Sequence, residues 1–419
     1  MIERSLRYVT AAVALMGVLG TSHARADVVL EWNALMQTAV STENPFSQAR
    51  LAAITQLAVF TAVNAVTRRY EPYLDDVQAP FGASAEAAAV AAAHRVLTHY
   101  LPASAPTLDA ARDQSLAAIP NGFRKQAGLS VGEAAAAAMI DARADDGSAP
   151  PQFFLPSSTD PGEWQTTPSC PSAGGILYHW GNVKPFGVAS SSQFRADPPP
   201  RLGSFRYWKD YVEVVQVGDA ASTLRPADRA DVARFYNAVL AVGVWNDVAR
   251  QLARARKTTL SENARMLALL NMAISDGLVT VMETKYHYRF WRPETAIHNG
   301  AADGNRRTEG DAAFTPFITT PCFPSYPSAH ATGSYAARAI LARIFGEHRH
   351  AIELASPAVP DAQLEYDSLE EITDDIDDAR VYGGIHFRFD QRAGARQGDE
   401  IAGYIYKKLL RPLHGKHRW

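Results

Sequence analysis

Three short segments, far apart in the sequence, carry side chains that could together bind a small, multiply charged oxyanion. They read KYHYRFWRP, FPSYPSAH and RVYGGIH. Fixed cations neutralise oxyanion oxygens, and a guanidinium offers two parallel donors to them. An imidazole titrates near neutral pH and can move protons. The segments supply three cations, a hydroxyl, a backbone amide and two imidazoles, in Lys285, Arg292, Arg380, Ser328, Ala329, His330 and His386.

The first segment, Lys285–Pro293, is predicted to end a helix. The preceding residues, Ser261–Met282, are rich in Leu, Met, Ala and Val at helical spacing. On a continuous helix Lys285 and Arg292 would be separated by about 700° and share one face. Two basic residues alone more often mark a solvated face. Burial is favoured here by the surrounding aromatic residues, Tyr286, Tyr288, Phe290 and Trp291.

The second segment is predicted to be a turn that leads into a helix. Ser328 stands at an N-cap position, and ATGSYAARAILARIF continues as a good helix former. A helix start presents free N–H groups and a positive dipole end, which suit an anion. His330 in the first turn could point at that anion. Taken alone, an ordinary cap beside a packed histidine explains this segment equally well.

The third segment, Arg380–His386, needs a bend before its two ends can meet. On an unbroken helix, residues six apart lie about 120° from each other. Gly383-Gly384 is expected to relax the backbone and permit convergence. The acidic run before Arg380 is expected to be a solvated helix face.

This ordered set resembles the superfamily that joins vanadium-dependent haloperoxidases with acid phosphatases and type 2 phosphatidic acid phosphatases. The family pattern is K-x6-RP, then PSGH, then SR-x5-H. The resemblance is closest to soluble bacterial haloperoxidase-like proteins, whose FWRP, FPSYPSGHA and YGGIHFRFD phrases are nearly repeated, and it extends over most of the mature chain. Two positions depart from the pattern: Ala329 replaces a glycine, and Ala379 replaces a serine.

The resemblance implies a role for each candidate residue. Lys285, Arg292 and Arg380 would hold the oxygens of vanadate or phosphate, with added hydrogen bonds from Ser328 and the Ala329 amide. His330 would be the acid–base group. His386 would ligate vanadium in a haloperoxidase, or attack phosphorus and become phosphohistidine in a phosphatase. The implied cofactor is vanadate in the first case and none in the second.

Three functions therefore stay open. The first is an exported vanadate-dependent haloperoxidase that oxidises halide with hydrogen peroxide. The second is a soluble acid phosphatase acting on phosphomonoesters. A phosphoryl group in transfer spreads charge over three equatorial oxygens, the arrangement that vanadate adopts, so the residues alone do not separate the two enzymes. The third is a non-catalytic oxyanion-binding protein, against which both histidines argue. The preferred halide and the oligomeric state stay undetermined.

The start of the chain predicts export. Residues 1–26 combine Arg4 and Arg7, an apolar stretch and an Ala24-Arg25-Ala26 cleavage site, as in a secretory signal peptide. A periplasmic or secreted protein is expected, with no transmembrane segment in its mature part. The formal net charge of −3 does not suit general nucleic-acid binding. Small molecules are the expected partners, namely hydrogen peroxide and halide, or a phosphate ester.

The remaining chain is expected to be an all-α helical bundle in three parts. They are a helical part over residues 27–146, a Pro/Gly/Ser-rich wrapping segment over 147–204, and a helical part over 205–419 that carries the site. The resemblance implies paired four-helix bundles. So long a loop is usually functional, and Trp164, Trp180, Lys184 and Phe186 are candidates for the pocket rim. Export would permit a disulfide between Cys170 and Cys322, which would fix the FPSYPSAH loop.

The expected helices follow from apolar spacing, caps and breakers. They are Phe46–Arg69, Ser84–Tyr100, Thr107–Ile119, Ser130–Asp145, Tyr207–Gln216, Pro226–Arg256, Ser261–Phe290, Ser328–Phe345 and about Gly384–Leu410. Strand-like alternation is expected to be rare.

Overall fold

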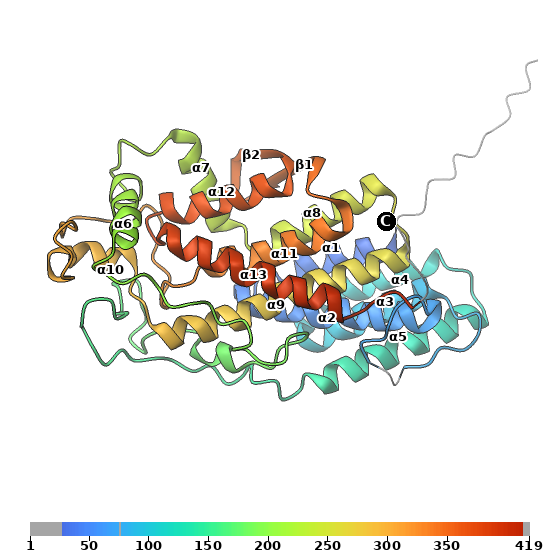
Figure 1. Cartoon of the computed structure of the whole chain (residues 1–419). Coiled ribbons are helices and arrows are strands. Elements are labelled where there is room, and N and C mark those ends of the chain that lie inside the picture. The colour runs from blue at the N-terminus through green and yellow to red at the C-terminus, as the bar shows by residue number, and fades with distance from the viewer. Residues whose placement is uncertain (1–26, 75–76, 414–419) are drawn as a thin grey trace, which may run out of the picture.

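The computed structural model describes residues 27–74 and 77–413, and the predicted signal peptide lies outside this range. The described part is mainly helical, as predicted, and it also has one two-stranded hairpin (Figure 1). The α-helices are α1 (Val28–Val40), α2 (Pro45–Thr67), α3 (Ala85–Tyr100), α4 (Ala105–Ala117), α5 (Phe123–Ala142), α6 (Phe205–Val217), α7 (Ala227–Ala238), α8 (Ala241–Arg256), α9 (Leu260–Tyr288), α10 (Pro293–His298), α11 (Ala329–Phe345), α12 (Leu369–Tyr382) and α13 (Arg388–Lys408). Short 3₁₀ turns span Pro102–Ser104, Tyr178–Asn182 and Gly300–Ala302.

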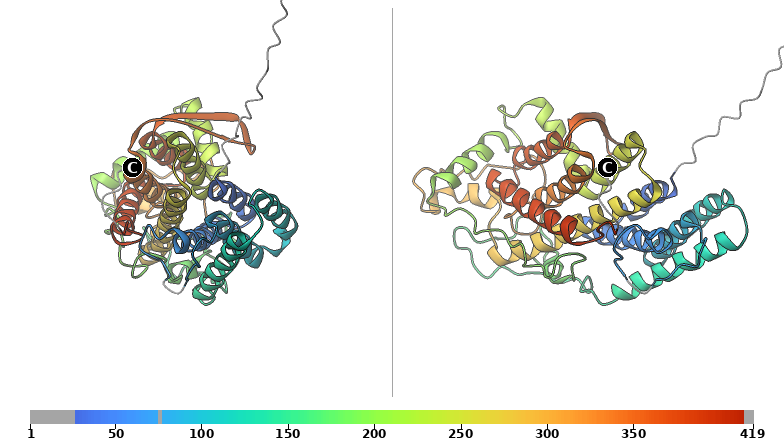
Figure 2. Two further views of the ribbon diagram at one scale, coloured as in Figure 1. Left: turned by 90° about the vertical axis from the view of Figure 1, so that its right-hand side faces the viewer. Right: turned by 45° about the vertical axis from the view of Figure 1, so that its right-hand side comes forward.

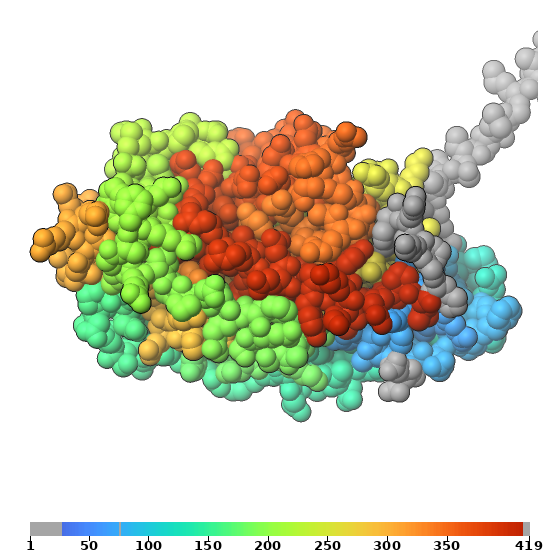
Figure 3. All heavy atoms as spheres, in the orientation of Figure 1, coloured from blue at the N-terminus to red at the C-terminus, as the bar shows by residue number. Residues whose placement is uncertain are grey.

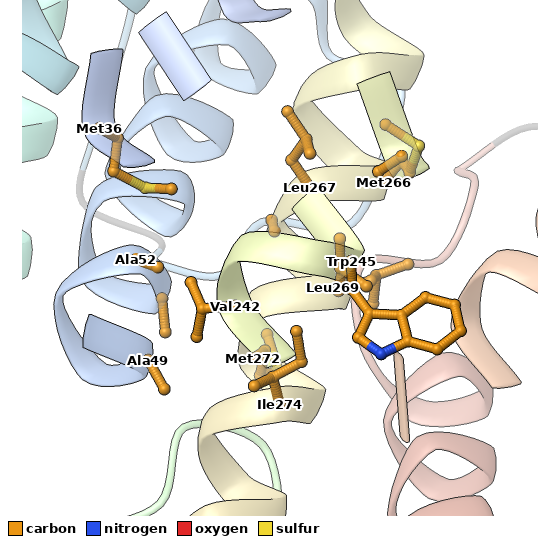
Figure 4. Close-up of a cluster of buried hydrophobic side chains, with 14 of the residues drawn as sticks. Met36, Ala49, Ala52, Val242, Trp245, Met266, Leu267, Leu269, Met272 and Ile274 are labelled. Atoms are coloured by element: carbon orange, nitrogen blue, oxygen red, sulfur yellow. The ribbon is translucent and has the colours of Figure 1, made fainter. Parts of the chain in front are cut away.

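Helix α9 is the central element of the fold. It begins with a capping box, in which the Thr259 side chain accepts from the Glu262 amide and the Glu262 side chain accepts from the Thr259 amide. Nearly every residue from Ser261 to Met282 is buried, because α9 packs against α2 on one side and against α11 and α13 on the other. Figure 4 shows Leu267, Leu269 and Ile274 among the side chains of this core. The apolar run in the sequence is therefore the signature of a helix covered on all sides.

The first helical part packs beside one end of α9. Helix α2 begins at Asn44, whose side chain accepts from the amides of Phe46 and Ser47, and Pro45 occupies its first turn. Alanine-rich α3 and α5 lie against α2 and against each other. Figure 2 shows these helices gathered at one end of an elongated molecule.

The second helical part consists of α11, α12 and α13 with α7 and α8. Helices α11 and α13 approach closely, since a Cβ atom on Gly398 would lie 2.4 Å from the Thr332 carbonyl oxygen. The expected helix over Pro226–Arg256 is wrong: the chain leaves helical geometry at Val239-Leu240 and forms α7 and α8 instead. This break matters because it lies next to the candidate site.

A β-hairpin was not expected and is present. Strands β1 (His348–Ser356) and β2 (Val359–Ser368) pair antiparallel, with Ile352 opposite Tyr366 and Leu354 opposite Leu364. The inward residues pack on α7, α8 and α12. The alternation in AIELAS and AQLEY was the signal that could have predicted it.

The wrapping segment over residues 147–204 follows one long side of the molecule (Figure 3). Its main anchor is Asp276 of α9, a fully buried carboxylate that accepts from the amides of Phe186, Gly187 and Val188 at 2.6, 2.7 and 2.9 Å. Among the rim candidates, Trp180 lines a cavity beside the site, whereas Trp164 and Phe186 are buried elsewhere and Lys184 is exposed.

Two helices in the described part, α2 and α9, are long and apolar enough to cross a membrane by length and composition alone. Their apolar windows are 89% and 94% buried inside the protein. The protein core thus accounts for their apolar composition.

Candidate oxyanion site

Lys285 lies in the last turn of α9 and is completely buried. Its Nζ donates to the carbonyl oxygens of Pro324 and Ser325 at 2.8 and 2.6 Å. An ammonium has three donors, so one remains for a ligand. Burial lowers the pKa of Lys285 well below its usual 10.5, and the neighbouring charge of Arg292 lowers it further. A nearby anion would restore the preference for the charged form.

Arg292 does not share a helical face with Lys285, so that prediction is wrong. Helix α9 ends at Tyr288, Arg289 has a left-handed backbone (φ 48°), and Arg292 is the extended N-cap residue of α10. The physical reason is the burial of Phe290 and Trp291 in a separate aromatic cluster beside Phe387 and Phe389. The two cations converge because the chain turns back, not because of helical periodicity.

The Arg292 guanidinium is held by several fixed acceptors. Its Nε donates to the Phe323 carbonyl at 2.8 Å, and its Nη1 to the Ile385 carbonyl at 2.9 Å. Nη1 also lies 3.0 Å from Nε2 of His386. Within the described residues, Nη2 is buried and has no partner. One arm of the fork is therefore free for a ligand.

The helix start at Ser328 is as predicted. Ser328 is the N-cap of α11, and its hydroxyl accepts from the Ala331 amide at 3.3 Å. Ala329 is the first helical residue and has negative φ, so the alanine that replaces the family glycine causes no backbone strain. Its amide is one of the free N–H groups of a helix start.

His330 points one ring nitrogen at the protein and leaves the other free. The ring donates to the main-chain carbonyl of Tyr236, at the end of α7. In the part of the chain that the structure describes, its buried Nε2 has no partner. The donor is therefore Nδ1, and Nε2 is available to the site. Burial lowers the pKa of His330 well below 6.5, and the three nearby cations lower it further.

Arg380 and His386 meet through the predicted glycine turn. Helix α12 ends at Tyr382, and Gly384 has φ 77°, a conformation that favours glycine. Arg380 is buried, and among the described residues its one hydrogen bond is long, at 3.4 Å from Nη1 to the Tyr236 carbonyl. Its Nε has no partner among the described residues. Ala379, which replaces the family serine, packs in the apolar core.

Asp390 completes the site and was not predicted. Its Oδ2 accepts from His386 Nδ1 at 2.8 Å, from the Ser325 hydroxyl at 2.6 Å and from the Phe387 amide at 3.2 Å. This contact places the His386 proton on Nδ1 and turns the Nε2 lone pair toward Arg292. The H-x3-D spacing in HFRFD was the available signal, since residues four apart approach at a helix start.

The electrostatics of the site favour a multiply charged anion. Burial raises the pKa of Asp390 to about 6, against the lowering effect of the Ser325 hydrogen bond and of the nearby cations. Burial lowers the pKa of His386 well below 6.5, and Arg292, Lys285, Arg380 and His330 all lower it further. Three cations thus face one carboxylate and two neutral imidazoles.

A tetrahedral or trigonal oxyanion such as vanadate fits this donor set. Three buried nitrogen atoms, Arg292 Nη2, Arg380 Nε and His330 Nε2, have no partner in the described chain. Buried donors normally have partners, and leaving one unsatisfied costs about 1–3 kcal/mol. An anion would satisfy the two guanidinium arms, and Nε2 of His386 supplies a lone pair for a metal or a phosphorus atom.

The disulfide is present as predicted. Cys170 and Cys322 are bonded, with a Cα–Cα distance of 5.2 Å. The bridge joins the wrapping segment to the residue before Phe323, whose carbonyl holds Arg292. A second link is the Ile176 amide, which donates to the Cys322 carbonyl at 2.9 Å. The bond therefore fixes the loop that positions two of the three cations.

Comparison with known proteins finds one matching family model and one related protein, and both are named for vanadium chloroperoxidase. Residues 265–415, which include every candidate site residue, match a family described as the VCPO second helical-bundle domain. The vanadium chloroperoxidase of Curvularia inaequalis is 24% identical over 275 residues. That match covers 49% of this chain and 44% of the fungal protein, so it spans less than half the length of the relative.

Solved structures extend the similarity to nearly the whole chain. A bacterial vanadium-dependent iodoperoxidase superposes with a TM-score of 0.76 and 24% identity, covering 93% of this chain and 97% of the other. A bacterial vanadium-dependent chloroperoxidase gives a TM-score of 0.71 and 16% identity, covering 87% and 91%. These two likenesses concern the fold.

Proposed function

We propose that this chain belongs to the vanadium haloperoxidase superfamily and that it is an enzyme that oxidises halide with hydrogen peroxide at a vanadate site. The match of residues 265–415 to the family model, the fungal relative and the shared fold support this proposal. One observation is the main support. Lys285, Arg292 and Arg380 are buried together around two oriented histidines, and no carboxylate of the described residues is in direct contact with any of the three. Such a cluster is costly unless an anion binds to it.

Each residue has a distinct task in this proposal. The three cations would hold the oxygens of vanadate, and the amide of Ala329 would add a hydrogen bond. His386 would be the nitrogen ligand, oriented by Asp390. Bound vanadate would supply the chemistry that activates hydrogen peroxide toward a halide.

His330 would handle protons at the site. Its Nε2 is free, and its pKa lies well below 6.5 without a ligand. A neutral imidazole can accept a proton from peroxide as it binds, and the negative charge brought by the oxyanion would make that protonation easier. The Tyr236 carbonyl keeps the ring in this tautomer.

Phosphomonoester hydrolysis is the second candidate, and the His386–Asp390 pair supports it as well. A carboxylate on Nδ1 leaves a nucleophilic lone pair on Nε2, the arrangement needed to form a phosphohistidine. Simple anion binding would need neither this orientation nor the free nitrogen of His330. The non-catalytic alternative therefore has the least support.

Export remains part of the proposal. Asp27, the first residue after the predicted cleavage site, is the N-cap of α1, so the fold needs nothing before it to begin that helix. The disulfide suits an oxidising compartment such as the periplasm.

The test uses protein purified from expression of the full chain, freed of vanadate and then titrated with it. Oxidation of iodide or bromide by peroxide and hydrolysis of 4-nitrophenyl phosphate are measured in parallel. Oxidation that requires vanadate supports the proposal. Hydrolysis that vanadate inhibits, without oxidation, supports the phosphatase. The His386→Ala variant should lose either activity, while His348→Ala, an exposed histidine on β1, should keep it.

A further inference from the structure

A cavity of about 510 Å³ lies directly beside the oxyanion site. Ala329, His330 and Arg380 line both the cavity and the site. A molecule in this cavity would therefore lie against the imidazole and the guanidinium proposed to act on the oxyanion. The volume is within the range of pockets that bind small organic ligands.

The walls of the cavity come from seven parts of the chain. They are the start of α2, the wrapping segment, the α7–α8 junction, α9, the loop before α11, the start of α11 and α12. Most of the wall is apolar, and its apolar side chains include Phe46, Leu177, Trp180, Ala241 and Phe323. The break between α7 and α8 and the long wrapping segment thus both contribute to one pocket.

Aromatic side chains form one side of the cavity. Phe46 packs edge-on against Trp180, with ring centroids 5.7 Å apart, and against Phe323 at 6.3 Å. Edge-to-face and offset contacts favour a further aromatic ring. Leu177, on the same wall, has a left-handed backbone (φ 61°), a conformation that non-glycine residues hold only where surrounding structure fixes it.

The described wall offers no countercharge to a charged occupant. Apart from His330 and Arg380, the titratable residue in this wall is His179. Its Nδ1 accepts from the Gln152 amide at 3.1 Å, and burial lowers its pKa below 6.5, so it is neutral at pH 7. A cation would be repelled by Arg380. An anion would be drawn past the apolar wall to the oxyanion site.

We propose that this cavity binds an uncharged aromatic molecule that accepts the halogen. This inference rests on the proposed function, because the acceptor uses the oxidised halide made next to it. The reaction balances as R–H + X⁻ + H₂O₂ + H⁺ → R–X + 2 H₂O. A carbon–hydrogen bond breaks and a carbon–halogen bond forms. Peroxide is reduced to water by two electrons, and the leaving proton ends in water.

Binding is tested first, with vanadate-free protein and no turnover. Isothermal titration calorimetry measures 2-naphthol, which is uncharged at neutral pH, and 2-naphthylmethylammonium, which carries a positive charge on the same ring system. Ala241→Phe and Ser47→Phe fill the cavity from α8 and from α2. Ala117→Phe on α4, exposed and not part of this cavity, is the matched control. Thermal unfolding by circular dichroism verifies that each variant folds.

The expected result is saturable binding of 2-naphthol, weakened at least ten-fold by each filling variant and unchanged by the control. The ammonium probe should bind at least ten-fold more weakly than the naphthol. Absence of naphthol binding overturns the inference. So does equal binding to the wild type and both filling variants, or equal binding of the two probes.

Turnover separates this inference from the proposed function. In vanadate-loaded protein, bromination of 2-naphthol relative to triiodide formation without an acceptor should fall at least ten-fold in both filling variants. Triiodide formation without naphthol binding refutes the acceptor pocket alone. Naphthol binding with no vanadate-dependent halide oxidation refutes the haloperoxidase. In that case the cavity still binds an uncharged aromatic group, but this group is the apolar leaving group of a phosphate ester and not a halogen acceptor.

Discussion

Replacing Asp390 by asparagine tests how the site orients its histidine. Oδ2 of Asp390 accepts three hydrogen bonds, from His386 Nδ1, the Ser325 hydroxyl and the Phe387 amide. An asparagine can keep this shape but offers a neutral oxygen, which is a weaker acceptor. His386 then loses a partner that fixes its tautomer and raises the basicity of Nε2.

The magnitude follows from these contacts. Hydrogen bonds to charged groups contribute about 1.5–3 kcal/mol and neutral ones about 0.5–1.5 kcal/mol. Weakening the contact to His386 should therefore reduce the free energy that holds the imidazole in its orientation by about 1–2 kcal/mol. That corresponds to a loss of roughly 10-fold, and comparable outer contacts of metal ligands cost about 10–100-fold. We expect vanadate-dependent halide oxidation by Asp390→Asn to fall by about 10–100-fold.

Anion binding should respond in the opposite direction. The substitution removes a negative charge that lies beside Lys285 and Arg292. Sulfate, which forms no bond to a ring nitrogen, should bind at least as tightly as to the wild type. The assay pairs steady-state oxidation with calorimetric sulfate binding. Asp399→Asn, an exposed carboxylate on the same helix, is the control and should change neither.

Two results would refute this reasoning. Activity of Asp390→Asn within two-fold of wild type would show that the carboxylate does not position His386. A parallel loss of sulfate affinity and activity would show that the substitution merely damages the fold.

Three further predictions follow from buried groups. Arg380→Gln should raise the melting temperature of the anion-free protein by about 1–3 °C, because it removes a buried cation that has few partners. The same substitution should weaken sulfate binding. A lower melting temperature would contradict this prediction. The pKa of His330 is depressed without a ligand, so a bound anion should raise it. Sulfate binding should therefore take up protons and become tighter as the pH falls below 7. Calorimetry in two buffers with different ionisation enthalpies measures the proton uptake, and proton release on binding would contradict the prediction. Breaking the Cys170–Cys322 bond should destabilise the protein by up to about 5 kcal/mol, because the unfolded chain gains conformational entropy. Urea unfolding of the variant with both cysteines replaced by serine measures this loss. An unchanged unfolding midpoint would refute the prediction.

Much of the fold was predictable because its helices carry local signals. Caps such as Ser84 and Ser328, breakers such as Pro45 and the apolar run of α9 predicted elements within a few residues. The β-hairpin was overlooked although its alternation is present in the sequence. The division of Pro226–Arg256 into α7 and α8 carries no proline or glycine at the break, so tertiary packing decides it.

The site was predictable in composition and less so in geometry. The glycine turn before His386 and the helix start at Ser328 were read correctly from residue types. Arg292 was placed on the wrong backbone, because the burial of Phe290 and Trp291 depends on residues far away in the chain. Asp390 was missed although its H-x3-D spacing from His386 is visible in the sequence, because that spacing alone does not show that the two side chains are in contact.

The central claim is that the three cations and the two histidines form one oxyanion site. A crystal structure of the protein soaked with vanadate tests it most directly, using anomalous scattering to locate the metal. Density within bonding distance of His386 Nε2, with oxygens contacting Lys285, Arg292 and Arg380, is the predicted result. Vanadium bound elsewhere, or no density at this position at saturating vanadate, would contradict the account.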